Sequence, residues 1–200
     1  HYDDLELGCS GTLIKHVQAG DTVTLIVITD SSYTNEKGEL IRAADQARVE
    51  GLKAAEKIGA ELICLDYKTF MVHFDEDLTK KLTRLIRQYK ADIIYSHWVH
   101  DLHRDHQFTG RAALMAGRHV PRFLMYRSNF YDTETDFRGR LYSDISDQFD
   151  LKIEAIKQHE SELTRVGYRW IDFFTQQHAN DGQKIGVKYA EKFDIIRYLM

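Results

Sequence analysis

Residues 91–106 read A-D-I-I-Y-S-H-W-V-H-D-L-H-R-D-H. The first six residues are an apolar run of strand length, which is typical of a strand buried on both faces of a sheet. A loop rich in histidine follows, and residues 107–118 then have the pattern of a helix. Strand, loop and helix in this order are part of a βαβ unit, in which sites lie in the loops at the carboxyl ends of the strands. The stretch therefore predicts a parallel sheet and a site in this loop.

Strands and helices alternate in the same way along the rest of the chain. We expect strands at residues 22–29, 61–65 and 122–126, and helices at residues 8–19, 42–58 and 75–89. We also expect one helix from Asp144 to about Leu163 and a last helix over residues 188–199, with an aromatic, poorly periodic segment at 165–179. This order predicts a Rossmann-like α/β fold with three layers and a mostly parallel sheet. Because no repeat or linker is visible, residues 1–200 are expected to form a single domain.

Composition excludes some classes of function. The formal net charge of -4 gives no electrostatic reason to expect DNA or RNA, whose phosphates require a basic surface. No apolar run approaches the roughly 20 residues that span a bilayer. Cys9 and Cys64 form neither a CxxC pair nor a disulfide framework, so a reducing, cytoplasmic location fits best. A single disulfide between them stays open.

The chain opens with a second group of candidate ligands, H-Y-D-D-L-E-L-G at residues 1–8. His1 and Asp4 are close enough in sequence to bind one ion from a tight turn, and His106 of the histidine-rich loop would add a second imidazole. Two histidines and one carboxylate make the three-ligand set of a catalytic zinc, which leaves a position for water. Because folding brings distant segments together, we predict that these three side chains bind one Zn²⁺ ion.

Neighbouring polar residues suit the other roles in a zinc hydrolase. Asp3 could accept a proton from water as a general base. His103 could stabilise an oxyanion or protonate a leaving amine, with Asp105 or Asp101 holding its imidazole in the right tautomer. Both groups also have a purely structural interpretation. Asp3 and Asp4 could cap a helix, and residues 103–106 could be a polar helix start with Asp105 as its cap.

Four segments resemble motifs of the PIG-L, or LmbE-like, family of zinc-dependent de-N-acetylases. H-Y-D-D-L-E-L-G-C-S-G-T at residues 1–12 is similar to the family's H-P-D-D-E-x-x-x-G-x-G-G. D-L-H-R-D-H-Q-F-T-G at residues 101–110 is similar to its D-x-H-P-D-H-x-x-x-G. D-I-S-D-Q-F-D-L-K-I-E-A-I at 144–156 and G-V-K-Y-A-E-K-F at 186–193 resemble two later family segments. The resemblance extends from His1 to about Arg197.

The resemblance implies an enzyme that removes the N-acetyl group from an N-acetylglucosamine-type sugar or glycoconjugate. It implies that His1, Asp4 and His106 bind zinc. It implies that Asp3 is the general base and that His103 is the charged partner of the tetrahedral intermediate. It suggests that Asp105 orients these residues without binding the metal itself. The partner is then a small acetamido sugar. A homo-oligomer stays open.

Arginines are the candidates for contacts with the rest of the substrate. Arg48 matches a family arginine that contacts the sugar, although it could equally be a solvated helix residue that pairs with Glu50 or Asp45. Arg127 and Arg138 are candidates to meet an anionic group on the substrate. We expect residues 33–40 and 127–140 to form the walls that select it.

The sequence departs from the family at several positions. Tyr2 and Arg104 replace proline, Leu5 replaces glutamate and Ser10 replaces glycine. None of these changes removes a ligand or the base, but loss of the prolines makes the turns less rigid. An acidic residue that the family often has near Thr69 is absent, which leaves the sugar open. The family's first strand should precede His1, so we expect it upstream of this sequence.

Three other functions are compatible with these residues. The same ligand set holds iron(II) in oxygenases, which usually have β-rich folds. An N-terminal His1 could bind copper in a histidine brace, although a helix-rich chain fits that poorly. A non-catalytic sugar- or metal-binding module is the third, and the presence of Asp3 argues against it.

Overall fold

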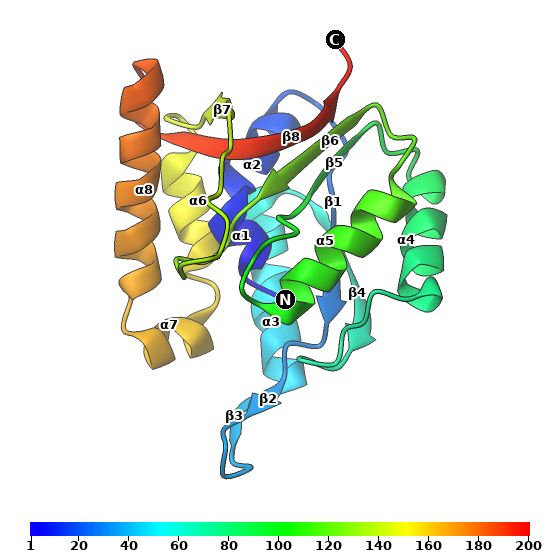
Figure 1. The fold of residues 1–200 in the computed structure, drawn as a ribbon. Helices are drawn as coiled ribbons and strands as arrows, with labels where there is room; N and C mark the ends of the chain where they lie inside the picture. Colours follow the sequence, from blue (N-terminus) through cyan, green and yellow to red (C-terminus); the bar gives the residue numbers. More distant parts are fainter. The chain divides into compact units, whose positions relative to one another are not determined.

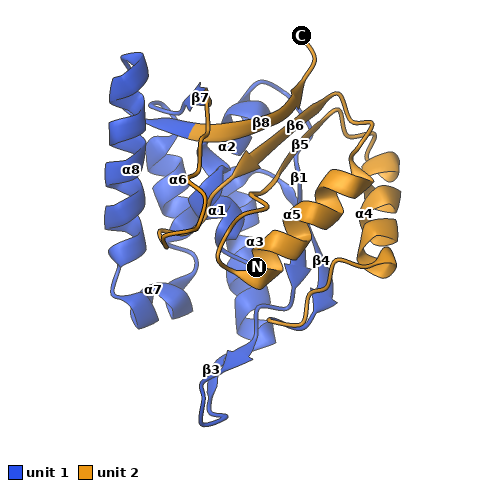
Figure 2. Ribbon diagram, in the orientation of Figure 1, with its two compact units in different colours: residues 1–69, 142–191 blue, residues 70–141, 192–200 orange.

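A computed structural model describes all residues from 1 to 200, which divide into two compact units (Figure 2). Unit 1 contains residues 1–69 and 142–191, and unit 2 contains residues 70–141 and 192–200. Both units mix helices with strands, as expected for an α/β fold. No helix of the chain is both long and apolar enough to cross a membrane. Cys9 and Cys64 are free thiols, so the disulfide that the sequence left open is not formed.

Unit 1 is built on a parallel pair of strands (Figure 1). Strand β1 (Thr24–Thr29) lies beside β4 (Glu61–Tyr67), with Thr24 opposite Glu61 and Thr29 opposite Tyr67. A short hairpin of β2 (Tyr33–Thr34) and β3 (Leu40–Arg42) precedes the connecting helix α3 (Ala44–Ile58). The other helices are α1 (Asp4–Gly8), α2 (Ser10–Gln18), α6 (Phe149–Ile156), α7 (Glu160–Val166) and α8 (Arg169–Ile185). Helix α6 packs against α1, α2 and α3.

Unit 2 contains the strand and helix on either side of the histidine-rich loop. Strand β5 (Ile93–His97) is parallel to β6 (Arg122–Tyr126), and α5 (Arg104–Ala116) connects them. Helix α4 (Glu76–Gln88) packs against α5 (Figure 1). Strand β8 (Ala190–Tyr198) runs antiparallel to β6, and β7 (Leu141–Asp144) lies beside β8, so the strand order is β5-β6-β8-β7. The sheet thus combines a parallel pair, β5 and β6, with an antiparallel neighbour, β8.

The prediction of a helix over residues 188–199 is wrong, because this segment forms strand β8. Gly186, at φ 78°, ends α8 immediately before it. Phe193, Ile195 and Ile196 favour a strand, and β6 offers backbone groups that pair with them. Sequence periodicity over so short an amphipathic segment does not distinguish the two structures.

Other elements also differ from the expectation. The single helix expected over residues 144–163 is split into α6 and α7, and residues 165–179, for which no element was predicted, fall largely within α8. Helix α5 begins at Arg104, three residues earlier than the predicted 107. The strand predicted at residues 122–126 is confirmed.

A fully buried ion pair joins several elements of unit 1. Lys152 of α6 donates from Nζ to Glu191 Oε1 at 2.8 Å, and both side chains are 0% exposed. The same ammonium also donates to the carbonyl oxygens of Glu6 and Leu7, at 2.8 and 2.9 Å. Glu191 accepts hydrogen bonds from backbone N–H groups at the start of α2, which satisfies donors that a helix leaves unpaired there. The pair therefore holds α1, α2, α6 and β8 in one arrangement.

Replacing Lys152 with methionine should strongly destabilise the protein. The change keeps the side-chain length but leaves Glu191 charged and buried without its cation, at a cost of about 3–5 kcal/mol in the free energy of unfolding. Urea denaturation measures this loss. Lys157→Met is the matched control, because Lys157 pairs with Glu154 at the surface and should cost less than about 1 kcal/mol. Equal losses in the two variants would contradict the interpretation.

Candidate metal centre and catalytic residues

The turn that opens the chain is anchored by the burial of Tyr2. This side chain is 2% exposed and packs with Val27 and Ala47, while its backbone N–H donates to Ser31 Oγ at 2.9 Å. A glycine, Gly51, lies where α3 passes over the ring, because a Cβ at that position would come within 2.1 Å of Tyr2 Cδ1. Packing thus supports the turn at the position where the motif that residues 1–12 resemble has proline.

His1 and Asp4 lie together at the start of α1. Nδ1 of His1 is 2.9 Å from Asp4 Oδ2, and the Asp4 side chain is buried. An imidazole nitrogen and a carboxylate oxygen therefore face the same small volume, as the spacing in the sequence predicts. Both atoms are of the kind that binds Zn²⁺.

Asp3 has an unusual backbone and an unusual environment. Its φ is 101°, a region that non-glycine residues rarely adopt, and its side chain makes no capping hydrogen bond to α1. Its Oδ2 instead accepts a hydrogen bond from Arg42 Nη1 at 2.9 Å. Burial raises the pKa of Asp3 to about 7, although the Arg42 guanidinium opposes that change. The capping interpretation of Asp3 is therefore not supported, and an acid–base interpretation fits its surroundings.

The histidine-rich loop of unit 2 brings three imidazoles into a stack. The rings of His97 and His106 lie 4.0 Å apart at 9°, and those of His103 and His106 lie 4.6 Å apart at 26°. Gly110, which the motif places one turn beyond His106, makes this possible. A Cβ there would lie 2.5 Å from the His97 carbonyl oxygen, so α5 could not approach β5 as closely. His97, which position alone placed near the site, is thus a neighbour of a predicted ligand.

Asp101 and Asp105 contact different groups. Asp101 is 1% exposed, and its Oδ1 is 3.3 Å from His106 Nδ1. Asn129 Nδ2 donates to both carboxylate oxygens of Asp101, at 2.6 and 2.7 Å. Asp105 Oδ2 instead accepts from the backbone N–H of Phe70 at 2.7 Å. The carboxylate beside the predicted ligand His106 is therefore Asp101.

His103 is the residue that caps α5, in place of the predicted Asp105. Its Nδ1 accepts a hydrogen bond from the backbone N–H of Asp105 at 3.2 Å. The neutral ring then carries its proton on Nε2. One face of the ring stacks on Phe70, with the centroids 5.2 Å apart. His103 is therefore oriented as a donor through Nε2.

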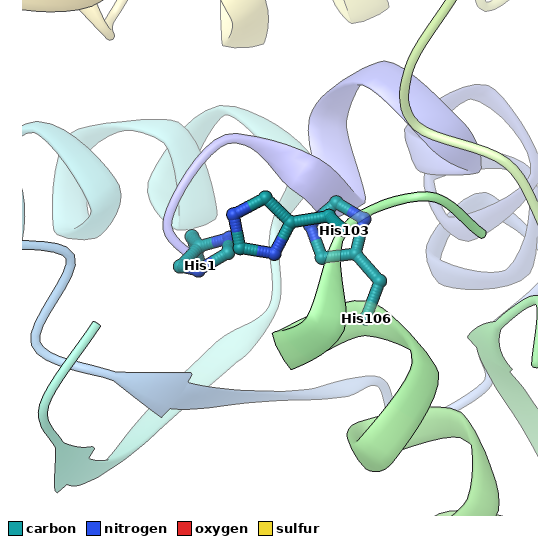
Figure 3. Close-up of side chains that lie close together, drawn as sticks. All are labelled: His1, His103 and His106. Carbon is teal, nitrogen blue, oxygen red and sulfur yellow. The ribbon is translucent and has the colours of Figure 1, made fainter. Parts of the chain in front are cut away.

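Two groups of three side chains could hold a metal ion. The ligand atoms of His1, His103 and His106 lie within 4.8 Å of one another, and so do those of Asp4, His97 and His106 (Figure 3 labels the first group). His106 belongs to both groups, whereas the other two predicted ligands are divided between them, His1 in the first group and Asp4 in the second.

Two of the arginines predicted to contact the substrate, Arg48 and Arg127, contact other protein groups instead. Arg48 is 59% exposed and lies 4.0 Å from Asp66, which replaces the pairing with Glu50 or Asp45 that the sequence suggested. Arg127 donates from Nε to the carbonyl oxygen of Asn129 at 2.8 Å.

Arg138 lies in a pocket of unit 2. The cavity has a volume of about 420 Å³, and Trp98, His100, Asp136, Arg140 and Asp194 also line it. The pocket combines aromatic, cationic and anionic groups, which are the contacts that a polar ligand requires.

Comparison with known proteins identifies related sequences. The sequence model of the PIG-L family, described as GlcNAc-PI de-N-acetylase, matches residues 1–116. A diacetylchitobiose deacetylase from Thermococcus kodakarensis is 25% identical over 214 residues, covering 96% of this chain and 78% of that protein.

Solved structures share the fold. The N,N'-diacetylchitobiose deacetylase from Pyrococcus horikoshii has a TM-score of 0.84 and 23% identity, covering 98% of this chain and 80% of that one. The 4-carboxy-2-hydroxymuconate hydratase GalB from Pseudomonas putida has a TM-score of 0.83 and 19% identity, covering 100% and 94%. Since these two proteins have different activities, the likeness in fold does not by itself define the reaction.

Replacing Asp101 with alanine should weaken metal binding. The change removes the carboxylate beside His106 and leaves Asn129 without its acceptor, and loss of such a supporting group typically lowers metal affinity about 10- to 100-fold. Titration of metal-free protein with Zn²⁺ in a calorimeter measures the effect. Asp92→Ala, at the exposed partner of Arg122, should bind Zn²⁺ like the wild type. Unchanged affinity in Asp101→Ala would show that Asp101 does not support a ligand.

Proposed function

Because the chain belongs to the PIG-L family, we propose that it is a zinc-dependent hydrolase that removes the N-acetyl group from an N-acetylglucosamine-type sugar or glycoconjugate. The relatives named above include deacetylases of N,N'-diacetylchitobiose, an acetylated sugar. The single observation that carries the proposal is the grouping of histidine and aspartate ligand atoms around His106, next to a buried Asp3.

We assign the metal to His1, Asp4 and His106. The residues fit Zn²⁺, because two neutral imidazoles and one carboxylate are its usual catalytic set. His1 Nδ1 and Asp4 Oδ2 already lie 2.9 Å apart, and Asp101 stands behind His106. When bound, Zn²⁺ would polarise the amide carbonyl and increase the acidity of the attacking water. His97 stacks on His106, with the ring centroids 4.0 Å apart.

Asp3 is the general base of the proposed reaction. Its carboxylate is nearly buried, and one oxygen is held by Arg42. The other oxygen can take the proton of the attacking water, and the same group can then return that proton to the departing amine. A raised pKa suits both steps, because a group that must accept and release a proton works best near the ambient pH.

His103 is the electrophilic partner. Its Nδ1 is occupied by the backbone N–H of Asp105, so Nε2–H is the donor that can stabilise the developing oxyanion. Phe70 fixes the plane of the ring by stacking. Asp105 thus contributes to the site through its backbone N–H, while its carboxylate holds the loop at Phe70.

Asp3→Asn should retain the metal and lose most of the activity. The amide keeps the shape of the side chain but cannot accept the proton, and loss of a general base typically lowers the rate about 100- to 10,000-fold. Zinc content by plasma emission, together with amine release from N-acetylglucosamine and N,N'-diacetylchitobiose measured with fluorescamine, tests this. Asp45→Asn, at an exposed residue of α3, is the control. A variant that deacetylates at the wild-type rate would exclude Asp3 as the base.

Removal of the metal should abolish amine release without unfolding the chain. Dialysis against dipicolinate followed by addition of Zn²⁺ should restore it, because Asp4 and His106 lie on helices α1 and α5, whose backbone hydrogen bonds do not involve the ion. Circular dichroism follows the fold while fluorescamine follows the reaction. Recovery that requires iron(II) and dioxygen, with none from Zn²⁺, would favour the oxygenase alternative.

A further inference from the structure

Arg42, at the end of β3, is the largest fully buried side chain of the protein. It is 2% exposed, although arginine is almost never fully buried unless it is paired. Its Nη1 donates to Asp3 Oδ2 at 2.9 Å, and its Nη2 donates to Glu50 Oε2 at 3.0 Å. One planar cation thus joins Asp3 to a carboxylate on α3.

The carboxylates that surround Arg42 away from Asp3 are themselves fixed by other contacts. Glu50 accepts hydrogen bonds from the backbone N–H of Ser161 at 2.9 Å and from its hydroxyl at 2.6 Å. Glu162, the next residue of α7, lies 4.0 Å from Arg42 Nε. Because the guanidinium is rigid and planar, contacts on two of its edges define the direction of the third. Arg42 therefore cannot rotate away from Asp3 without breaking contacts with both α3 and α7.

A second group of buried charges continues the network behind Arg42. His159 Nδ1 lies 3.4 Å from Arg42 Nη2, and His159 Nε2 lies 3.5 Å from Glu6 Oε2. Glu6 belongs to α1, the helix that Asp3 precedes. Residues 3–6 therefore contact buried partners at both ends, Asp3 through Arg42 and Glu6 through His159.

The hydrogen bond from Arg42 also distinguishes the two carboxylate oxygens of Asp3. Oδ2 is occupied by Nη1, so the lone pairs of Oδ1 lie outside this bond. The backbone of Asp3, at φ 101°, is a conformation that surrounding contacts must maintain. We propose that Arg42 is a positioning residue, which holds the Asp3 carboxylate in the one orientation where Oδ1 can accept a proton from water. This inference rests on the proposed function, since it acts through the base.

Arginine variants at Arg42 test the proposal. Arg42→Lys keeps the charge but cannot hold Asp3 and Glu50 together, and Arg42→Ala removes both bonds. Displacement of a reacting group by about 1 Å can lower the rate about 100-fold, so kcat should fall by about that factor in Arg42→Ala while KM and zinc content stay near the wild-type values. Methylguanidinium added to Arg42→Ala should restore part of kcat, because it can occupy the emptied space. Added to Asp3→Asn it should have no effect.

Arg165→Ala is the matched control, because Arg165 pairs with Glu162 in the same network but makes no hydrogen bond to Asp3. It should keep the wild-type kcat. An equal fall in Arg165→Ala, or a rise in KM at constant kcat in Arg42→Lys, would overturn the positioning role. If Arg42→Ala does not fold, Arg42→Lys gives the same comparison.

A measurement independent of activity separates this inference from the proposed function. Thermal unfolding of Arg42→Lys, Asp3→Asn and the double variant forms a double-mutant cycle. Non-additive effects support a direct hold of Arg42 on Asp3, and additive effects overturn it. If the wild type releases no amine from any acetamido sugar, the proposed function is wrong, and the cycle alone then decides whether Arg42 holds Asp3.

Discussion

Every charge that this chain buries must have a partner, and that constraint shapes both units. A buried ionised group without a counter-charge is far too unfavourable for a protein of this size to tolerate. Lys152 and Glu191 satisfy the requirement between helices and a strand, and Arg42 and Asp3 satisfy it beside the candidate site. In unit 2 the same role falls to Asp101, which lies against His106 and accepts from Asn129. The pairs differ in purpose. Lys152 and Glu191 join structural elements, whereas Asp3 precedes and Asp101 contacts a proposed metal ligand.

The fold could be predicted from local patterns where burial was uniform. Strand β6 follows from its apolar run, and β1 and α4 follow in the same way, with small shifts at their ends. Strand β8 could not be predicted, because its partner β6 lies about 70 residues earlier and the pairing is visible only after folding. The break between α6 and α7 lies at residues 157–159, where His159 is buried beside Glu6 through a tertiary contact that the sequence does not reveal.

Some residues of the candidate site could be identified from the sequence, and others could not. Motif spacing leads to His1, Asp4 and His106 as the proposed zinc ligands, because histidine and aspartate are usual ligands of zinc. The structure groups His1 with His103 and His106, and Asp4 with His97 and His106. Arg42 gave no signal, since a lone arginine after a polar loop is ordinarily a surface residue. The sequence placed His97 near the site by its position only, because its stacking on His106 depends on how closely α5 approaches β5 at Gly110. A hydratase and a deacetylase that share this fold show why such side-chain detail must carry the assignment of the reaction.

The positive φ of Asp3 has a consequence for how this position can drift during evolution. Aspartate, asparagine and glycine tolerate such a backbone far better than longer side chains do. Glutamate would preserve the acid but is disfavoured by the main chain, so chemistry and conformation together leave few accessible substitutions. Asparagine and glycine are the substitutions that the backbone tolerates best, and both remove the proposed proton acceptor. We expect relatives that lose the proposed reaction to carry one of these two residues at this position.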